Sequence, residues 1–124
     1  MTNKILLVED DVDLCDTYRD ALEAVGYHCM SVHRGDLAIE KLPQFLPDVV
    51  VLDLNLPRAS GHIVLGYIKN HFALNKTKVV IVSGEERMVR SVTSLWGVDQ
   101  YLPKPVSPSQ LQSVITNLLR NAAA

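Results

Sequence analysis

Val49-Val50-Val51-Leu52-Asp53-Leu54-Asn55-Leu56-Pro57 is the stretch of sequence on which the prediction of the fold depends. Four apolar residues run without a break into an aspartate, which is typical of a strand buried on both faces, as in parallel sheets. The middle of such a strand has no room for a charge. We therefore expect Asp53 to lie where the strand ends, at the carboxyl edge of the sheet, where open parallel sheets bind their ligands.

Strand-like and helix-like segments alternate along the rest of the chain. The predicted strands cover residues 4–8, 27–32, 49–52, 78–82 and 99–102. Each is followed by residues whose apolar side chains recur at helical spacing. Alternation of this kind with short connections predicts an α/β fold, in which right-handed crossovers place helices on both faces of a parallel sheet.

The helices are located by their apolar stripes and by the residues at their ends. Gly26 is expected to close the first helix, and Pro43 and Pro47 to stop a short second one. Ser107, or Ser109, is expected to cap the last helix. The predicted stripe of the first helix is Val12, Cys15, Tyr18 or Arg19, Leu22 and Val25. That of the third is Ile63, Val64, Tyr67, Ile68 and Phe72, and the fourth carries Met88, Val89, Val92, Leu95 and Trp96.

The composition fits one ordinary domain. The chain has 124 residues, of which 48% are hydrophobic and 21% charged, with a net charge of -2. This balance gives no argument for nucleic acid or a membrane surface as a partner. No apolar run is long enough to cross a membrane, and no signal-peptide pattern is present. Cys15 and Cys29 lack metal-ligand spacing and are expected to be buried free thiols of a cytoplasmic protein.

Several polar residues are expected to meet at one edge of the sheet, because parallel strands end on the same side. They are Glu9-Asp10-Asp11, Asp53, Ser83-Gly84 and Lys104. Carboxylates that converge in a partly desolvated pocket repel one another by on the order of 4 kcal/mol per contact pair. A divalent cation relieves that repulsion, and a few carboxylates completed by water suit Mg²⁺. Zinc would require histidine or cysteine, and His28, His33, His62 and His71 are expected to be surface or packing residues.

Lys104 and Ser83 add what a phosphoryl group needs. A lysine supplies a compact cation to one phosphoryl oxygen, and a hydroxyl donates to another. With a metal and a lysine to neutralise the transferred charge, an aspartate oxygen is a competent phosphoryl acceptor. The sequence therefore predicts an aspartyl-phosphate site with Asp53 as the nucleophile.

Four motifs in order resemble the receiver domain of two-component response regulators, such as those of chemotaxis. They are Ile5-Leu6-Leu7-Val8-Glu9-Asp10-Asp11, Asp53 with Leu56-Pro57 and Gly61, Ser83, and Tyr101-Leu102-Pro103-Lys104-Pro105. The resemblance covers nearly the whole chain and implies a flavodoxin-like (βα)5 sandwich with strand order 2-1-3-4-5. It implies a single receiver domain over residues 1–124, standing alone or cut from a longer regulator, and a phosphohistidine of a sensor kinase or phosphotransfer protein as the donor.

The resemblance also implies a role for each matching position. Asp53 is the phosphoacceptor, and Ser83 and Lys104 bind the phosphoryl group. Asp10, Asp53 and the backbone carbonyl of Asn55 are Mg²⁺ ligands, and Glu9 holds a metal-bound water. The Lys104–Pro105 bond is expected to be cis. Phosphoryl acceptance and autodephosphorylation are self-catalysed, so the chain is not expected to be an enzyme in the usual sense.

The signal is expected to leave the site through Ser83 and Tyr101. These residues would change the face made by the fourth helix, the fifth strand and the fifth helix, which binds a downstream output domain or protein. Asn55 and Glu85 either tune the lifetime of the phosphoryl group or are plain loop residues. Trp96 is either partly packed in the core or exposed on the output face. That face is expected to include Met88, Arg90, Trp96, Tyr101, Gln110 and Gln112.

The sequence departs from the receiver pattern in three places, and two rival functions are considered. Gly84 follows Ser83 where a residue with a side chain is usual, and the segment up to Gly97 is about one residue short. Arg58 is larger than expected and either contacts a kinase or is solvated. One rival is a haloacid-dehalogenase-type phosphatase, which would need a carboxylate where Asn55 stands. The other is a pseudo-receiver, a binding module that works without phosphorylation.

Overall fold

The computed structural model describes residues 2–84, 86–87, 89–90 and 96–123. Most of the expected fourth helix lies outside these residues, including Met88 and Leu95. The elements in chain order are β1 (Lys4–Val8), α1 (Val12–Glu23), β2 (His28–Val32), α2 (Gly35–Phe45), β3 (Val49–Leu52), α3 (Gly61–Asn70), the short 3₁₀ helix η1 (Phe72–Leu74), β4 (Lys78–Ser83), β5 (Gln100–Pro103) and α5 (Pro108–Ala123).

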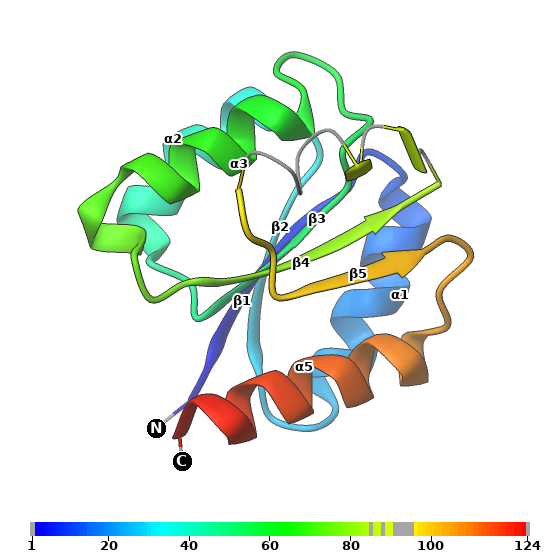
Figure 1. Ribbon diagram of the computed structural model, residues 1–124. Helices are drawn as coiled ribbons and strands as arrows, with labels where there is room; N and C mark the ends of the chain where they lie inside the picture. Colours follow the sequence, from blue (N-terminus) through cyan, green and yellow to red (C-terminus); the bar gives the residue numbers. More distant parts are fainter. Residues whose placement is uncertain (1, 85, 88, 91–95, 124) are drawn as a thin grey trace.

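All five strands are parallel and form one sheet in the order β2-β1-β3-β4-β5. Helices α2 and α3 cover one face of the sheet, and α1 and α5 cover the other (Figure 1). The predicted flavodoxin-like, three-layer α/β sandwich is confirmed. Because the strands are parallel, their carboxyl ends all lie on the same edge, and β3 occupies the middle of the sheet.

The unbroken apolar runs of the strands supply two separate halves of the core. Successive side chains of a strand point to opposite faces, so each run divides between the two layers. In β3, Val50 and Leu52 face the layer of α2 and α3, whereas Val49 and Val51 face the layer of α1 and α5. All four residues are buried, which explains why the run contains no polar side chain.

The prediction that Pro43 stops the second helix is wrong. Pro43 lies inside α2, which continues to Phe45. The helix continues because Leu42 and Phe45 are both buried against the sheet on either side of the exposed proline. It ends when Leu46 takes a left-handed conformation, with φ of 49°, and donates its N–H to the Leu42 carbonyl at 2.9 Å.

The predicted stripe of the third helix is only partly correct. Val64 and Ile68 are buried as predicted, but Ile63 is 56% exposed. Leu65, which the prediction left out, takes its place in the core, because residues 61, 64, 65 and 68 share one side of a helix. Phe72 is 88% exposed, since α3 ends before it and η1 begins there.

The first helix also ends earlier than predicted. Its last helical residue is Glu23, and Ala24 forms its C-cap. Gly26 takes its positive φ of 97° in the turn that follows the helix. Val25 therefore lies beyond the helix and is exposed, whereas the side chain of Tyr18 is buried and that of Arg19 is half-buried.

Ser107 is the residue that caps α5. Its hydroxyl accepts the backbone N–H of Gln110 at 3.1 Å, and its carbonyl accepts the N–H of Leu111 at 3.1 Å. Replacing Ser107 by alanine is expected to lower the free energy of unfolding by about 1 kcal/mol, because the first turn loses its acceptor. Ser109→Ala is the matched control, because among the described residues the Ser109 hydroxyl has a hydrogen bond only with the Ser107 hydroxyl, at 3.3 Å. Equal losses for both variants in urea denaturation would contradict this assignment.

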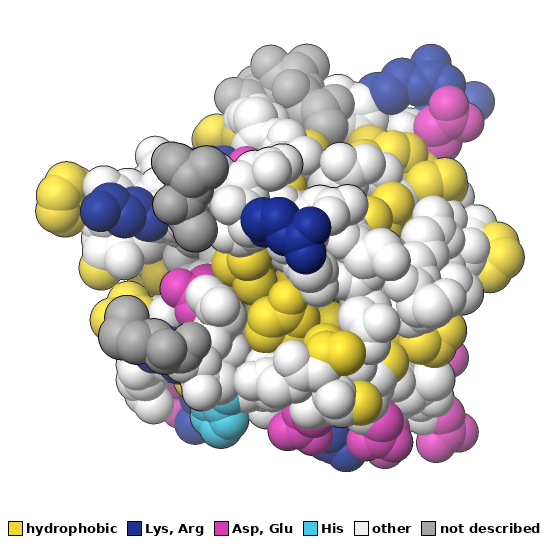
Figure 2. Space-filling model, turned by 90° about the horizontal axis from the view of Figure 1, so that it is seen from below, with side chains coloured by type: hydrophobic (Ala, Val, Ile, Leu, Met, Phe, Trp, Pro, Cys, Tyr) yellow, Lys and Arg dark blue, Asp and Glu magenta, His cyan; other side chains and the backbone are white. Residues whose placement is uncertain are grey.

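The surface carries few charges over α5. That helix has a single charged residue, Arg120. Figure 2 views the molecule from the side on which α5 lies in Figure 1, and acidic side chains gather mainly along one rim of this face. Among the described residues, no helix is long and apolar enough to cross a membrane.

Candidate functional site

Three carboxylates meet at the carboxyl edge of the sheet. Glu9 follows β1 and Asp53 follows β3, the neighbouring strand, and each is only 5% exposed. Asp10 stands next to Glu9 and is exposed. Ligand oxygens of Glu9, Asp10 and Asp53 all lie within 4.8 Å of one another. The topology thus brings together carboxylates from residues that are more than forty positions apart.

Lys104 joins the two buried carboxylates. It follows β5, and its ammonium lies 2.6 Å from Glu9 Oε1 and 2.9 Å from Asp53 Oδ2. The peptide bond between Lys104 and Pro105 is cis. One cation is therefore shared by two anions, and the site as a whole keeps an excess of negative charge.

Backbone N–H groups hold the other oxygens of the same carboxylates. Asp53 Oδ1 accepts the N–H of Asn55 at 3.0 Å, and Glu9 Oε2 accepts the N–H of Asp11 at 3.2 Å. Each side chain is thus held from both sides, by Lys104 and by the loop that follows its own strand. Asp11 has a separate role, because its Oδ1 accepts the Leu14 N–H at 3.1 Å and caps α1.

Burial shifts the protonation of the site. Loss of water raises the pKa of Glu9 from 4.5 to about 7, even though the hydrogen bond from Lys104 opposes the shift. The neighbouring side chains of Asp10 and Asp53 raise it further. Burial lowers the pKa of Lys104, but the hydrogen bonds that its ammonium donates to Glu9 and Asp53 outweigh this effect and raise it. Lys104 therefore remains a cation, whereas the charge of Glu9 varies near neutral pH.

The Glu9 shift predicts how stability depends on pH without divalent cations. The pKa of Glu9 is higher in the folded protein than in the unfolded chain. The contribution of Glu9 to the free energy of unfolding is therefore full below pH 4.5 and is lost as the pH rises through about 7. We expect wild-type unfolding free energy in EDTA to fall relative to Glu9→Gln by up to about 3 kcal/mol across that window. Urea denaturation at several pH values measures the difference. A difference that stays constant from pH 4.5 to 7 would contradict the raised pKa.

The donor set fits a hard divalent cation. Its three side chains offer only carboxylate oxygens, and Asp10 is exposed enough to leave room for bound water. Oxygen donors with incomplete protein coordination are typical of Mg²⁺ sites. The charge balance also fits a bound cation. Lys104 is shared between Glu9 and Asp53, so an additional cation near these oxygens would offset the negative charge that remains.

Ser83 lies at the end of β4, on the same edge. Ser83 is fully buried. Ile81 of β4 pairs with Leu52, the last residue of β3, and β4 continues two residues farther, to Ser83. The Ser83 carbonyl accepts the backbone N–H of Lys104 at 3.1 Å and the hydroxyl of Tyr101 at 3.4 Å. Ser83 therefore connects the Lys104 loop with Tyr101, whose ring is half-buried on β5.

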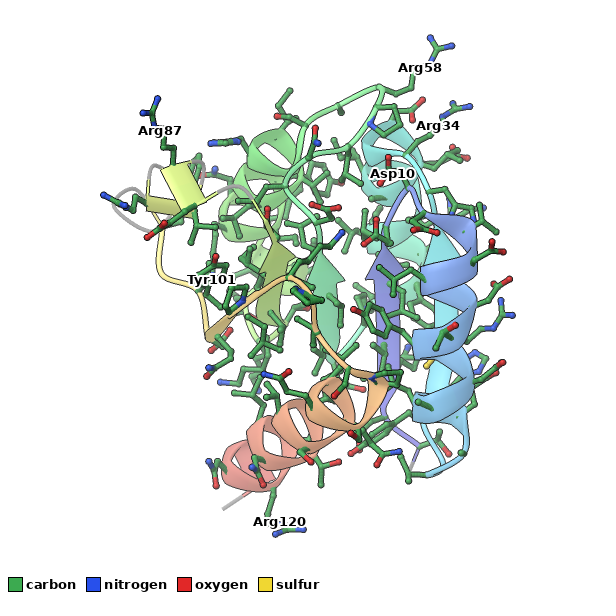
Figure 3. The ribbon with its side chains drawn as sticks, turned by 90° about the vertical axis from the view of Figure 1, so that its right-hand side faces the viewer. Asp10, Arg34, Arg58, Arg87, Tyr101 and Arg120 are labelled. Carbon is green, nitrogen blue, oxygen red and sulfur yellow. The ribbon has the colours of Figure 1, made fainter. Side chains whose placement is uncertain are left out.

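The other predicted residues that the structure describes near this edge, Asn55, Arg58 and Gly84, are all exposed. Asn55 is exposed in the loop after Asp53, and Glu85 lies outside the described residues. Arg58 is exposed, with φ of 70°, and points away from the site at the same end of the molecule as Asp10 (Figure 3). Gly84 is exposed, and a Cβ added there would meet no described atom within 4 Å.

One residue that was predicted on the output face lies elsewhere. Gln112 does not belong to it, because its side-chain amide donates to the Ala21 carbonyl of α1 at 2.8 Å. Trp96 is half-buried against the core beside Gly66, as expected for partial core packing. Arg90 and Gln110 are exposed. Met88 lies outside the described residues.

His33 is a neighbour of the site that the sequence did not indicate. Its Nδ1 lies 2.9 Å from the backbone carbonyl of Glu9. The contact exists because β2 pairs with β1 and the Glu9 N–H donates to Val32 at 3.1 Å. The only signal in the sequence was the position of His33 just after a strand, and the strand order was needed to interpret it.

Comparisons with known proteins agree on one family. The family model of the response regulator receiver domain matches residues 5–116. The transcriptional regulatory protein CpxR of Escherichia coli (strain K12) is 31% identical over 121 residues, which cover 97% of this chain and 50% of CpxR. The polar-differentiation response regulator DivK of Brucella ovis is 28% identical over 127 residues, which cover 98% of this chain and all of DivK. The chain thus spans half the length of CpxR and the full length of DivK.

Solved structures show the same relationship. The signal receiver domain of a Luxo repressor protein from Vibrio parahaemolyticus superimposes with a TM-score of 0.86 at 27% identity, covering 99% of this chain and 94% of that one. A CheY-like receiver domain protein from Methanospirillum hungatei gives 0.87 at 26% identity, covering 99% and 98%. The haloacid-dehalogenase-type alternative is therefore set aside. This chain belongs to the response regulator receiver domain family.

Proposed function

We propose that Asp53 accepts a phosphoryl group from a phosphohistidine on a sensor kinase or a histidine phosphotransfer protein. The observation that carries the proposal is the pairing of the buried Asp53 carboxylate with Lys104 at 2.9 Å, beside two further carboxylates. Response regulators generally work with histidine kinases and output domains, and the family assignment gives this chain a role in two-component signalling.

The chain's own residues account for the transfer. An Asp53 carboxylate oxygen attacks phosphorus, the bond from phosphorus to the imidazole nitrogen breaks, and the imidazole leaves with a proton. Lys104 is placed to accompany the added charge, and Ser83 supplies a hydroxyl. Asp10, Asp53 and the Asn55 carbonyl would hold Mg²⁺, and Glu9 a water bound to it. When bound, Mg²⁺ neutralises charge on the phosphoryl oxygens.

The output follows from the connections of Ser83. Phosphorylation adds up to two negative charges at Asp53. Since Ser83 bonds to both Lys104 and Tyr101, a shift of Lys104 toward the phosphoryl group would change the support of the Tyr101 ring. The face made by the fourth helix, β5 and α5 would then change its affinity for a downstream partner. Asn55 and Glu85 would tune the rate of hydrolysis, and the protein would act in the cytoplasm as a signalling module with no other substrate.

Phosphorylation with a small donor tests the proposal. The protein is incubated with acetyl phosphate and Mg²⁺, and intact-mass and peptide mass spectrometry locate the modification. The expected result is one phosphoryl group per chain on the peptide that contains Asp53, lost when Mg²⁺ is removed with EDTA. Absence of modification under both conditions would favour the pseudo-receiver alternative, and modification of another residue would refute the assignment.

A further inference from the structure

The Tyr18 hydroxyl is a buried polar group that the proposed function does not use. Tyr18 lies on α1, is 2% exposed, and donates to the backbone carbonyl of Val106 at 2.9 Å. Burial of a hydroxyl is unfavourable unless it is hydrogen-bonded, and phenylalanine would fill the same apolar space. Burial also raises the pKa of Tyr18, which keeps the hydroxyl protonated as a donor. The hydroxyl is therefore best explained by its bond to Val106.

That bond fixes one end of the loop that carries Lys104. At the other end, the Lys104 N–H donates to the Ser83 carbonyl at 3.1 Å. The side chain of Val106 is 6% exposed and packs in the same half of the core as Tyr18. The backbone is thus anchored at Lys104 and at Val106, with Pro105 between the two anchored residues. Figures 1 and 3 both place the connection from β5 to α5 beside α1.

An open groove lies beside this loop on the side of α1. This groove has a volume of about 380 Å³ and is lined by Leu14, Tyr18, Lys104, Pro105 and Val106. Lys104 is half-buried and Pro105 is exposed where they border the groove, so few buried contacts oppose a shift of the loop there. Tyr18 and Val106 both line this groove, and the hydrogen bond between them limits how far the loop can shift.

We propose that Tyr18 is a positioning residue, whose hydroxyl braces the loop after β5 so that the Lys104 ammonium reaches Asp53. The lysine side chain has several rotatable bonds, and its contacts at 2.6 and 2.9 Å with Glu9 and Asp53 depend on where its backbone starts. This inference rests on the function proposed above, in which Lys104 accompanies the phosphoryl group.

Tyr18→Phe tests the brace while it keeps the ring in the core. With acetyl phosphate and Mg²⁺, the rate of phosphorylation is expected to fall about fivefold, the effect of one net hydrogen bond. Tyr27→Phe is the matched control. Its hydroxyl also lies at hydrogen-bond distance, 2.8 Å, from a residue about ninety positions away, Thr116 Oγ1, but that bond does not involve the Lys104 loop. Tyr27→Phe is expected to be phosphorylated at the wild-type rate.

A double-mutant cycle separates positioning from general destabilisation. If Tyr18 acts through Lys104, adding Tyr18→Phe to Lys104→Ala should leave the residual rate unchanged, because the braced group is already gone. An undiminished fivefold effect in that background would overturn the inference. So would equal rates for Tyr18→Phe and wild type.

Hydrogen exchange tests the brace independently of phosphorylation. The Lys104 amide is expected to exchange about tenfold faster in Tyr18→Phe than in wild type or Tyr27→Phe, since the loop can then open locally. If wild type acquires no phosphate but this difference is found, the proposed function fails and the brace stands. If the Lys104 amide exchanges at the same rate in all three proteins, the brace is refuted.

Discussion

The Asp53→Asn variant is expected to take up no phosphoryl group from acetyl phosphate under conditions in which the wild type is fully modified. Asparagine has nearly the shape of aspartate, but its amide is not a nucleophile for phosphorus and carries no charge for a metal. The rate should fall below detection by mass spectrometry. Because Ser83 and Lys104 are unchanged, modification that persists in Asp53→Asn would mean that another residue is the acceptor.

The same variant should fold at least as well as the wild type. The asparagine oxygen can still accept the Asn55 N–H, which lies 3.0 Å from Asp53 Oδ1. Lys104 keeps Glu9 as a partner at 2.6 Å. Asp53 is among the groups that raise the pKa of Glu9, so its neutralisation lowers that pKa and relieves repulsion. We expect the free energy of unfolding to change by less than about 1 kcal/mol, or to rise.

Asp48→Asn is a control from the other end of the same strand. Asp48 directly precedes β3, as Asp53 directly follows it, and Asp48 Oδ2 accepts the Lys4 N–H at 2.7 Å. This variant removes a carboxylate at the amino edge of the sheet. It should be phosphorylated on Asp53 like the wild type, because the edge with the site is unaffected. Loss of modification in Asp48→Asn would indicate that the Asp53 result reflects general disruption.

The sequence predicted which side chains converge at the sheet edge better than it predicted the helices. Parallel strands have one common geometric consequence, namely that their carboxyl ends share an edge. The positions of Glu9, Asp53 and Lys104 after three apolar runs therefore sufficed to bring them together. Their pairing through one ammonium did not follow from the runs, because it depends on the path of the loop after β5.

The errors in the helices have local causes. Pro43 was taken as a stop, but the burial of Leu42 and Phe45 outweighs the loss of one helical hydrogen bond. Ile63 and Phe72 were assigned to the core from spacing alone, whereas Leu65 and the end of α3 decide the buried side. Long-range contacts were equally invisible. The bond from Tyr18 to Val106 joins residues 88 positions apart, and no local pattern announces it.

A second large effect is expected at Gly35. Gly35 begins α2, and its N–H donates to the Pro57 carbonyl at 3.1 Å. A Cβ added to Gly35 would lie 1.8 Å from the carbonyl oxygen of Ala59, a backbone atom that cannot move away without the loop after β3. Gly35→Ala is expected to lower the free energy of unfolding by about 3 kcal/mol, at the upper end of overpacking costs.

Gly84→Ala is the matched control for this clash, because a Cβ there would meet no described atom within 4 Å. Its free energy of unfolding should stay within about 0.5 kcal/mol of wild type in urea denaturation. The Gly35 clash also connects stability to the site, since the displaced residue, Ala59, lies in the loop that follows Asp53 and Asn55. Refolded Gly35→Ala should therefore accept phosphate more slowly than Gly84→Ala at a temperature where both are folded. Equal stability of the two variants would show that the loop yields without cost, and that α2 does not fix its position.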